Sequence, residues 1–202
     1  MKTPIATRAI SALLASLNSN AAVLTFDDIA NGTYGGYAGF SFVNLSVYNP
    51  NNAQFGFNNS GAVNGIVSGL NVGFRNTAGL LQFSSAAPFI FNSGYFTAVW
   101  NDGLSVVVNG LRNGLITNTL SFVAQPTSPA LINFNWTNID TITINASGGT
   151  FHTGFTGGSG TALAFDNLIV NSPVPEPTVA VMLGVALTAW AATSGLRRRR
   201  FT

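Results

Sequence analysis

Few side chains in this sequence are suited to catalysis. The chain has one histidine, His152, and no cysteine, which excludes thiol catalysis, disulfides and cysteine-based zinc sites. His152 lies in the glycine-rich stretch GGTFHTGFTGGSG. A general base needs an orienting partner and a nucleophile nearby, and no sequence pattern identifies either. The simplest interpretation is a solvated loop histidine.

The carboxylates do not form an obvious catalytic pair. Asp27 and Asp28 are neighbours and would point to opposite faces of a strand, so they could not act on one bond. Glu176 is the only glutamate and lies in a proline-rich segment. A glycosidase needs two carboxylates beside its substrate. We therefore predict no catalytic residues, and a secreted glycoside hydrolase using aspartates from distant strands is the least favoured alternative.

Asp28 and Asp166 share a different feature. Each is in phase with apolar residues of a predicted strand, and neither strand offers Lys or Arg. A buried carboxylate needs a cation or hydrogen-bond donors. A Ca²⁺ ion held by both carboxylates and backbone carbonyls would satisfy them. The alternative is that Asp28 caps a turn in water while Asp166 accepts hydrogen bonds from backbone N–H groups.

Tyr34 and Tyr37 are the aromatic residues best placed to bind a ligand. They lie among glycines in NGTYGGYAGF, where a ring could stack on a sugar. The alternative is a Tyr-Gly loop that covers one end of the fold. The asparagine-rich polar faces of the predicted strands could hydrogen-bond glycans, or they could reflect a compositional habit.

The segments that must position these residues alternate between apolar and polar side chains. INFNWT, TITINA and VNLSVY each place apolar side chains on one face and polar ones on the other, as half-buried antiparallel strands do. Turn-forming residues recur between such segments, and no sustained helical period appears. We predict an all-β, two-sheet antiparallel sandwich, jelly-roll-like, over residues 23–171. Its strands fall near 23–29, 39–48, 65–74, 80–84, 88–99, 104–109, 115–124, 130–137, 140–146 and 163–170.

Charge is scarce in the predicted sandwich. Charged residues make up 7% of the chain, against about 25% in an average soluble protein. The predicted sandwich has two basic and five acidic residues, a net charge of −3. A nucleic-acid partner requires a basic surface, so we exclude one.

The N-terminus is typical of a secretory signal peptide over residues 1–22. Lys2 and Arg8 form a positive region, and a short apolar stretch and small residues near Ala21 follow. The alternative is a disordered tail.

The C-terminus predicts a membrane anchor. Residues 179–196 carry no charge, and as a helix they would extend about 27 Å, close to the ~30 Å hydrocarbon core. The arginines that follow would stop transfer and stay in the cytoplasm; they are Arg197, Arg198, Arg199 and Arg200. Residues 197–202 are thus a basic cytoplasmic tail. A basic nucleic-acid tail or a core helix would not explain why the two features adjoin.

A proline-rich stalk at 172–178 precedes the predicted helix and contains Pro175, Glu176 and Pro177. This motif, an apolar helix and an arginine cluster in that order resemble the PEP-CTERM sorting signal. The resemblance covers about 30 residues. It implies processing by an exosortase in the inner membrane of a Gram-negative bacterium and an association with exopolysaccharide. The protein would cross the inner membrane once before processing and then reach the surface or the extracellular matrix.

The body resembles the ectodomains attached to such tails and the jelly rolls of carbohydrate-binding modules. The resemblance rests on TFDDI, AVWNDGL and AFDNLIV. The second family implies a Ca²⁺ site between the first and last strands. We expect an exported, membrane-tethered surface or matrix protein that is not an enzyme. A glycan-binding module with a structural Ca²⁺ is the alternative.

Overall fold

The computed structural model describes residues 21–75, 79–171 and 173. The predicted sorting motif, transmembrane helix and basic tail lie outside these residues, as do residues 1–20 of the predicted signal peptide. Within the described part, no helix is both long enough and apolar enough to cross a membrane.

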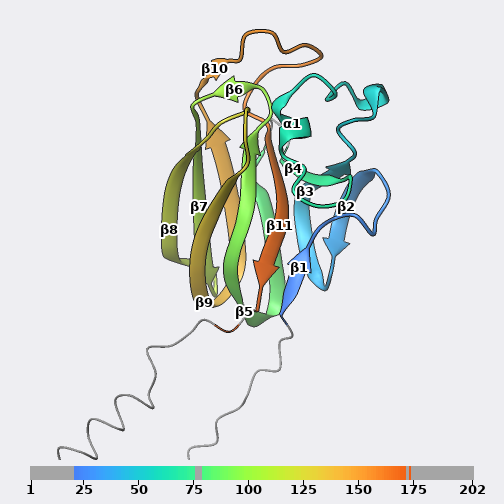
Figure 1. Ribbon diagram of the computed structural model, residues 1–202. Coiled ribbons are helices and arrows are strands. Elements are labelled where there is room, and N and C mark those ends of the chain that lie inside the picture. Colours follow the sequence, from blue (N-terminus) through green and yellow to red (C-terminus); the bar gives the residue numbers. More distant parts are fainter. Residues whose placement is uncertain (1–20, 76–78, 172, 174–202) are drawn as a thin grey trace, which may run out of the picture.

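The predicted all-β antiparallel fold is confirmed (Figure 1). The strands are β1 (Ala22–Leu24), β2 (Gly32–Tyr37), β3 (Phe40–Tyr48), β4 (Val72–Arg75), β5 (Leu81–Ala98), β6 (Asn101–Asp102), β7 (Leu104–Arg112), β8 (Leu115–Ala124), β9 (Ala130–Ser147), β10 (Thr150–Phe151) and β11 (Leu163–Val170). Two short helices, η1 (Ala53–Phe55) and α1 (Gly61–Asn64), lie between β3 and β4.

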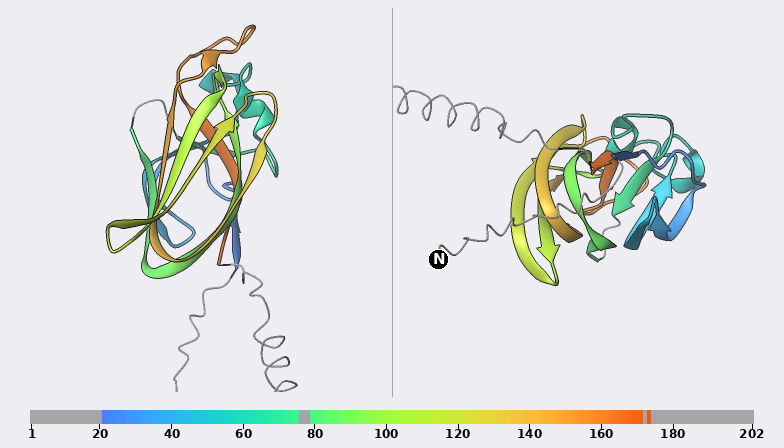
Figure 2. Two further views of the ribbon diagram at one scale, coloured as in Figure 1. Left: turned by 90° about the vertical axis from the view of Figure 1, so that its left-hand side faces the viewer. Right: turned by 90° about the horizontal axis from the view of Figure 1, so that it is seen from below.

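The strands form two layers because β5 and β9 each contribute to both. The first layer contains β2, β3, residues 81–84 of β5, residues 141–147 of β9, then β7 and β8. The second contains residues 130–136 of β9, residues 91–98 of β5, then β11 and β1. β4 joins β3 to β11. Seen from below, the strands curve as a double layer (Figure 2).

The long strands differ from the sequence prediction. The predicted strands 80–84 and 88–99 are one strand, β5, and those at 130–137 and 140–146 are one strand, β9. The register between them shifts between Ser84 and Phe89, next to Pro88. Proline has no N–H to donate to a ladder and is tolerated at such irregularities. The residues between the predicted segments, at 85–87 and 138–139, therefore lie inside continuous strands and do not end them.

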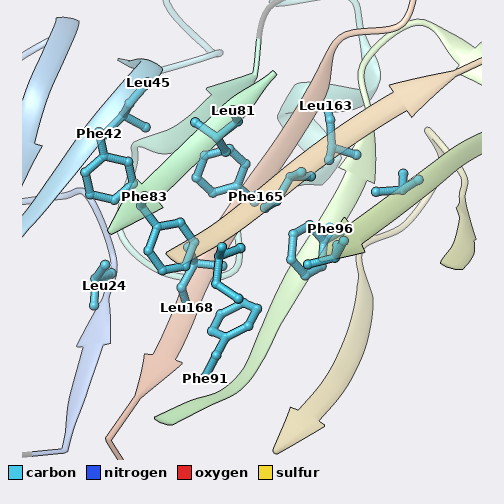
Figure 3. Close-up of a cluster of buried hydrophobic side chains, with 14 of the residues drawn as sticks. Leu24, Phe42, Leu45, Leu81, Phe83, Phe91, Phe96, Leu163, Phe165 and Leu168 are labelled. Atoms are coloured by element: carbon cyan, nitrogen blue, oxygen red, sulfur yellow. The ribbon is translucent and has the colours of Figure 1, made fainter. Parts of the chain in front are cut away.

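Phenylalanine dominates the space between the layers (Figure 3). Phe83 of the first layer packs edge-to-face on Phe91 of the second, with ring centroids 5.5 Å apart. Phe96 and Phe165 are also buried. Burial of each such ring contributes about 1.5–3 kcal/mol. The core therefore forms without disulfides.

The described chain begins and ends at the same end of the sandwich. β1 pairs with β11 in antiparallel register, so Ala22 lies opposite Val170. The helix α1 and the paired strands β6 and β10 lie at the opposite end (Figure 1). We call this opposite end the loop end.

Candidate functional site

Asp166 is fully buried and is held by backbone donors. One carboxylate oxygen accepts hydrogen bonds from the N–H groups of Val67 and Ser68, at 2.8 and 2.9 Å. The other accepts from the N–H of Asn167 at 2.7 Å. Burial raises the pKa of this carboxyl, and the three N–H donors oppose that rise. These contacts match the backbone-donor alternative for Asp166.

Asp27, and not the predicted Asp28, shares this loop with Asp166. Asp27 Oδ1 accepts from the N–H groups of Leu70 and Asn71, at 2.8 and 2.9 Å. The predicted phase failed because β1 ends at Leu24 and Phe26 adopts a φ of 64°, which breaks the strand's alternation. The two carboxylates together bind the backbone of residues 67–71. The strand predicted at 65–74 is therefore correct only from Val72, where β4 begins.

The groups around Asp27 and Asp166 are hydrogen-bond donors to the carboxylates and not ligands for a cation. The partners of Asp27 and Asp166 are N–H and O–H donors, whereas Ca²⁺ needs oxygen lone pairs. Among residues 21–75 and 79–171, no three His, Cys, Asp or Glu side chains gather as metal ligands.

Asp28, Tyr34 and Tyr37 have structural partners. The Tyr37 hydroxyl donates to Asp28 Oδ1 at 2.7 Å and accepts from the N–H of Phe26 at 3.1 Å. Burial, together with the bond to Asp28, raises the pKa of Tyr37 to about 12. The Tyr34 hydroxyl donates to the carbonyl of Ala30. Both tyrosines are half-buried against the core and lie on β2, a strand the sequence did not predict.

His152 acquires a partner that the sequence did not reveal. Its Nδ1 lies 2.8 Å from Asp102 Oδ1, because β10 pairs with β6 and brings position 102 beside residues 150–151. The ring also packs against Phe155, with centroids 4.4 Å apart. Within the described residues, Asp102 is the only side chain that hydrogen-bonds to this ring. The pair therefore joins the loop that contains His152 to β6 at the loop end.

A wide, uncharged surface covers the first layer on the side away from the core, and we call it the outer face. It consists of the outward-pointing residues that alternate with buried ones along the strands. These residues are Ser41 and Val43 of β3, Gln82 and Ser84 of β5, Thr141, Asn145 and Ser147 of β9, Ser105, Val107, Asn109 and Leu111 of β7, and Thr119, Ser121 and Val123 of β8. Thr143 of β9 has the same phase but is buried. Hydroxyl and amide groups predominate, and none of these residues is charged.

Two asparagine amides near the middle of the outer face are held in fixed orientations. Asn109 Oδ1 accepts from the Thr119 hydroxyl at 2.8 Å. Asn145 Oδ1 accepts from the guanidinium of Arg75 at 3.0 Å. Asn109 pairs with Thr143 and Val107 with Asn145, so the amides are diagonal neighbours. Because each oxygen is engaged, each amide presents its N–H₂ group in a defined direction.

Arg75 orients Asn145, and the sequence analysis missed it. It is buried, and its guanidinium also donates to the carbonyl of Thr161 at 2.9 Å. In the described part of the chain no carboxylate pairs with it, and burial lowers its pKa. An arginine at the end of an apolar strand was the only signal, and it did not indicate Asn145 as the partner.

No protein-family model and no curated protein matches the chain. Among solved structures it is similar to the arabinose-bound α-L-arabinofuranosidase MgGH51, with 13% identity over 74% of this chain and 26% of that one, and a TM-score of 0.43. The chain is also similar to TmCBM61 in complex with β-1,4-galactotriose, with 10% identity over 67% of this chain and 90% of that one, and a TM-score of 0.38. A third similar structure is the N-terminal tandem CBM22 domain of Paenibacillus barcinonensis Xyn10C, with 9% identity over 77% of this chain and 47% of that one, and a TM-score of 0.39. The chain spans about a quarter of the first and half of the third, and the function proposed below does not rest on these similarities.

Proposed function

We propose that this protein is an exported, membrane-tethered surface or matrix component whose outer face binds neutral polysaccharide. The observation that carries the proposal is the composition of the outer face. Hydroxyls and oriented amides there offer many hydrogen-bond donors and acceptors, and none of the outward-pointing residues is charged. The guanidinium of Arg75, which Asn145 contacts, is buried. A neutral glycan presents the same kinds of groups in a repeating array.

The position of the chain ends supports display on a tether. The described chain enters and leaves the sandwich at one end, because Ala22 and Val170 are opposite each other. A C-terminal anchor would therefore leave the outer face and the loop end accessible. The resemblance of Pro175-Glu176-Pro177 and the following residues to a PEP-CTERM signal adds an exosortase-type enzyme as processing partner, with the inner membrane as the first location.

We propose binding without hydrolysis. Asp102 orients His152, but no described hydroxyl hydrogen-bonds to the ring. Backbone donors bind both carboxylate oxygens of Asp166. They bind one oxygen of Asp27, and the Ser68 hydroxyl donates to the other at 3.4 Å. These carboxylates therefore support the fold and do not flank a substrate.

Retention on immobilised polysaccharide tests the binding surface. The full chain in detergent should be retained by neutral glucan, xylan or galactan more than by polyuronate, and added salt should change little because no ion pair is involved. Asn109→Ala should weaken retention. Asn133→Ala, an exposed asparagine of β9 in the second layer, is the matched control. Equal retention of both variants would refute the assignment of the outer face.

Membrane fractionation tests the tether. Deletion of residues 179–202 should release the protein, since this stretch supplies the proposed span. Replacing Pro175-Glu176-Pro177 by Ser-Gly-Ser should leave the protein in the membrane but stop its processing in the native host. A truncated chain that resists carbonate extraction would contradict the anchor, and unchanged processing would contradict the sorting motif.

A further inference from the structure

Strand β8 is an edge of the first layer. It pairs with β7, and no other described strand pairs with it. Figure 1 shows β8 at one side of the molecule, with β7 next to it. An edge strand presents N–H and C=O groups that another strand can bind.

Over residues 118–124, beyond a bulge at Thr117, this edge lacks the usual features that prevent strand addition. Natural edges are short, bulged, charged or interrupted by proline. β1 has 3 residues, and β2 contains three glycines with a register shift between Tyr34 and Gly36. β8 has 10 residues, LITNTLSFVA, without charge, glycine or proline. The second layer ends in another uncharged edge, residues 130–136 of β9, but its register with β5 shifts between Asn133 and Trp136 and Asn135 has a φ of 51°. Residues 118–124 of β8 are therefore the most regular edge among those compared.

The regular part of β8 runs over residues 118–124. The register with β7 shifts between Gly110 and Leu111, which leaves Thr117 as an extra residue. Beyond it, Thr119, Ser121 and Val123 point outward. Leu120 and Phe122 point inward and are half-buried against the core.

We propose that β8 pairs with β8 of a second copy of this chain, antiparallel, about a two-fold axis through Ser121. A two-fold contact places each residue opposite its symmetry mate. Ser121 then faces Ser121, Thr119 faces Val123, and Leu120 faces Phe122. These are hydroxyl–hydroxyl, β-branched and apolar pairs, which stabilise antiparallel ladders. The inward pair would cover apolar surface that one copy leaves half-exposed.

Charge favours a second copy over a charged partner at this edge. The predicted sandwich carries a net charge of −3, so two copies repel weakly, and a neutral contact adds no further like-charge repulsion. β8 has no charged residue. Arg112, just before it, is neutralised by Asp140 at 3.2 Å. The seven regular residues span about 24 Å, so we expect a small interface and weak, reversible association.

Site-specific crosslinking tests both partner and register, because the full chain has no cysteine. Opposite Cβ atoms in antiparallel strands lie about 4.5–5.5 Å apart, near disulfide distance. Under mild oxidation in detergent, Ser121→Cys should form a disulfide-linked dimer. The matched control is Ser105→Cys, an exposed serine on the neighbouring strand β7. We expect Ser121→Cys to crosslink about tenfold faster or more, since pairing raises the local thiol concentration.

A mixed experiment fixes the register. Thr119→Cys and Val123→Cys copies carrying different tags should crosslink with each other faster than either crosslinks with itself. Ser121→Lys should reduce dimer formation by unlabelled protein in sedimentation, with the circular dichroism spectrum unchanged. Equal crosslinking of Ser121→Cys and Ser105→Cys, or none at either, would overturn the proposal. Preferential self-crosslinking by Thr119→Cys would overturn the register.

Discussion

Polar groups have opposite roles on two regions of this sandwich. At residues 67–71, backbone N–H groups donate hydrogen bonds to the carboxylates of Asp27 and Asp166. On the outer face, hydroxyl and amide groups point away from a phenylalanine-rich core. The first region needs its polar groups in order to fold, whereas the second folds through the buried side of the same strands.

This difference indicates where function can reside. A buried carboxylate whose oxygens all accept from backbone donors has little capacity left for a ligand. Outward hydroxyls and amides contribute little to stability and remain free to bind a ligand. We infer that the carboxylates are structural and that the outer face and its edge strand carry the interactions.

Removal of the Asp166 carboxylate should have the largest effect on stability. Asp166→Ala leaves the buried N–H groups of Val67 and Ser68 without acceptors, and we expect a loss of about 3 kcal/mol or more. Asp166→Asn keeps one acceptor and should lose less. Urea unfolding of residues 21–173 measures both. A loss below about 1 kcal/mol for Asp166→Ala would remove the contrast between the regions.

Asp27 and Gly69 should show a smaller, coupled effect. Gly69 has a φ of 53°, and a Cβ there would collide with the Asp27 carboxyl. Gly69→Ala should cost about 1–2 kcal/mol. In Asp27→Ala the collision is absent, so adding Gly69→Ala to that variant should cost less. Additive losses in the double-mutant cycle would show that the two residues do not touch.

The burial of Tyr37 and its hydrogen bond to Asp28 should affect stability at alkaline pH. An unfolded tyrosine ionises near pH 10, whereas Tyr37 in the folded state has a pKa of about 12. Between these values only the unfolded state has lost the proton, so stability is complete below pH 10 and falls as the pH rises toward 12. Tyr37→Phe should remove this part of the slope in pH-dependent melts. An unchanged slope would exclude Tyr37 as its source.

Substitution on the outer face should have the smallest effect on stability. We expect Ser121→Lys to change the unfolding free energy of residues 21–173 by no more than about 0.5 kcal/mol. Lysine can extend into solvent there without losing a buried contact. A loss above about 1 kcal/mol would mean that the outer face is also required for folding.

The sequence predicted the parts of the fold that depend on alternation. The strand near 115–124 was predicted with its observed bounds, and the polar face of Thr141 and Asn145 was correct, although Thr143 in the same phase is buried. The prediction failed where a single backbone torsion interrupts the alternation of a strand. The positive φ of Phe26 does so, and Asp28 therefore does not share a face with Leu24 as predicted.

The candidate site was predictable only in its local composition. The polar faces of the strands were visible in TITINA, but β-strand order was not, so the proximity of Asn109 and Asn145 could not be inferred. The contacts of Arg75 with Asn145 and of Asp102 with His152 join residues 70 and 50 positions apart. Such contacts arise from sheet order, which no local pattern encodes.

Steric blockade tests the central claim most directly. The full chain has no cysteine, so a single introduced thiol can carry a bulky maleimide polymer at one chosen position. Labelled Ser105→Cys would cover the outer face, and labelled Asn133→Cys would cover the second layer. We predict that the label abolishes retention on neutral polysaccharide at Ser105→Cys and leaves it intact at Asn133→Cys. Retention that survives the label at Ser105→Cys, or that is lost equally at both positions, would contradict binding through the outer face.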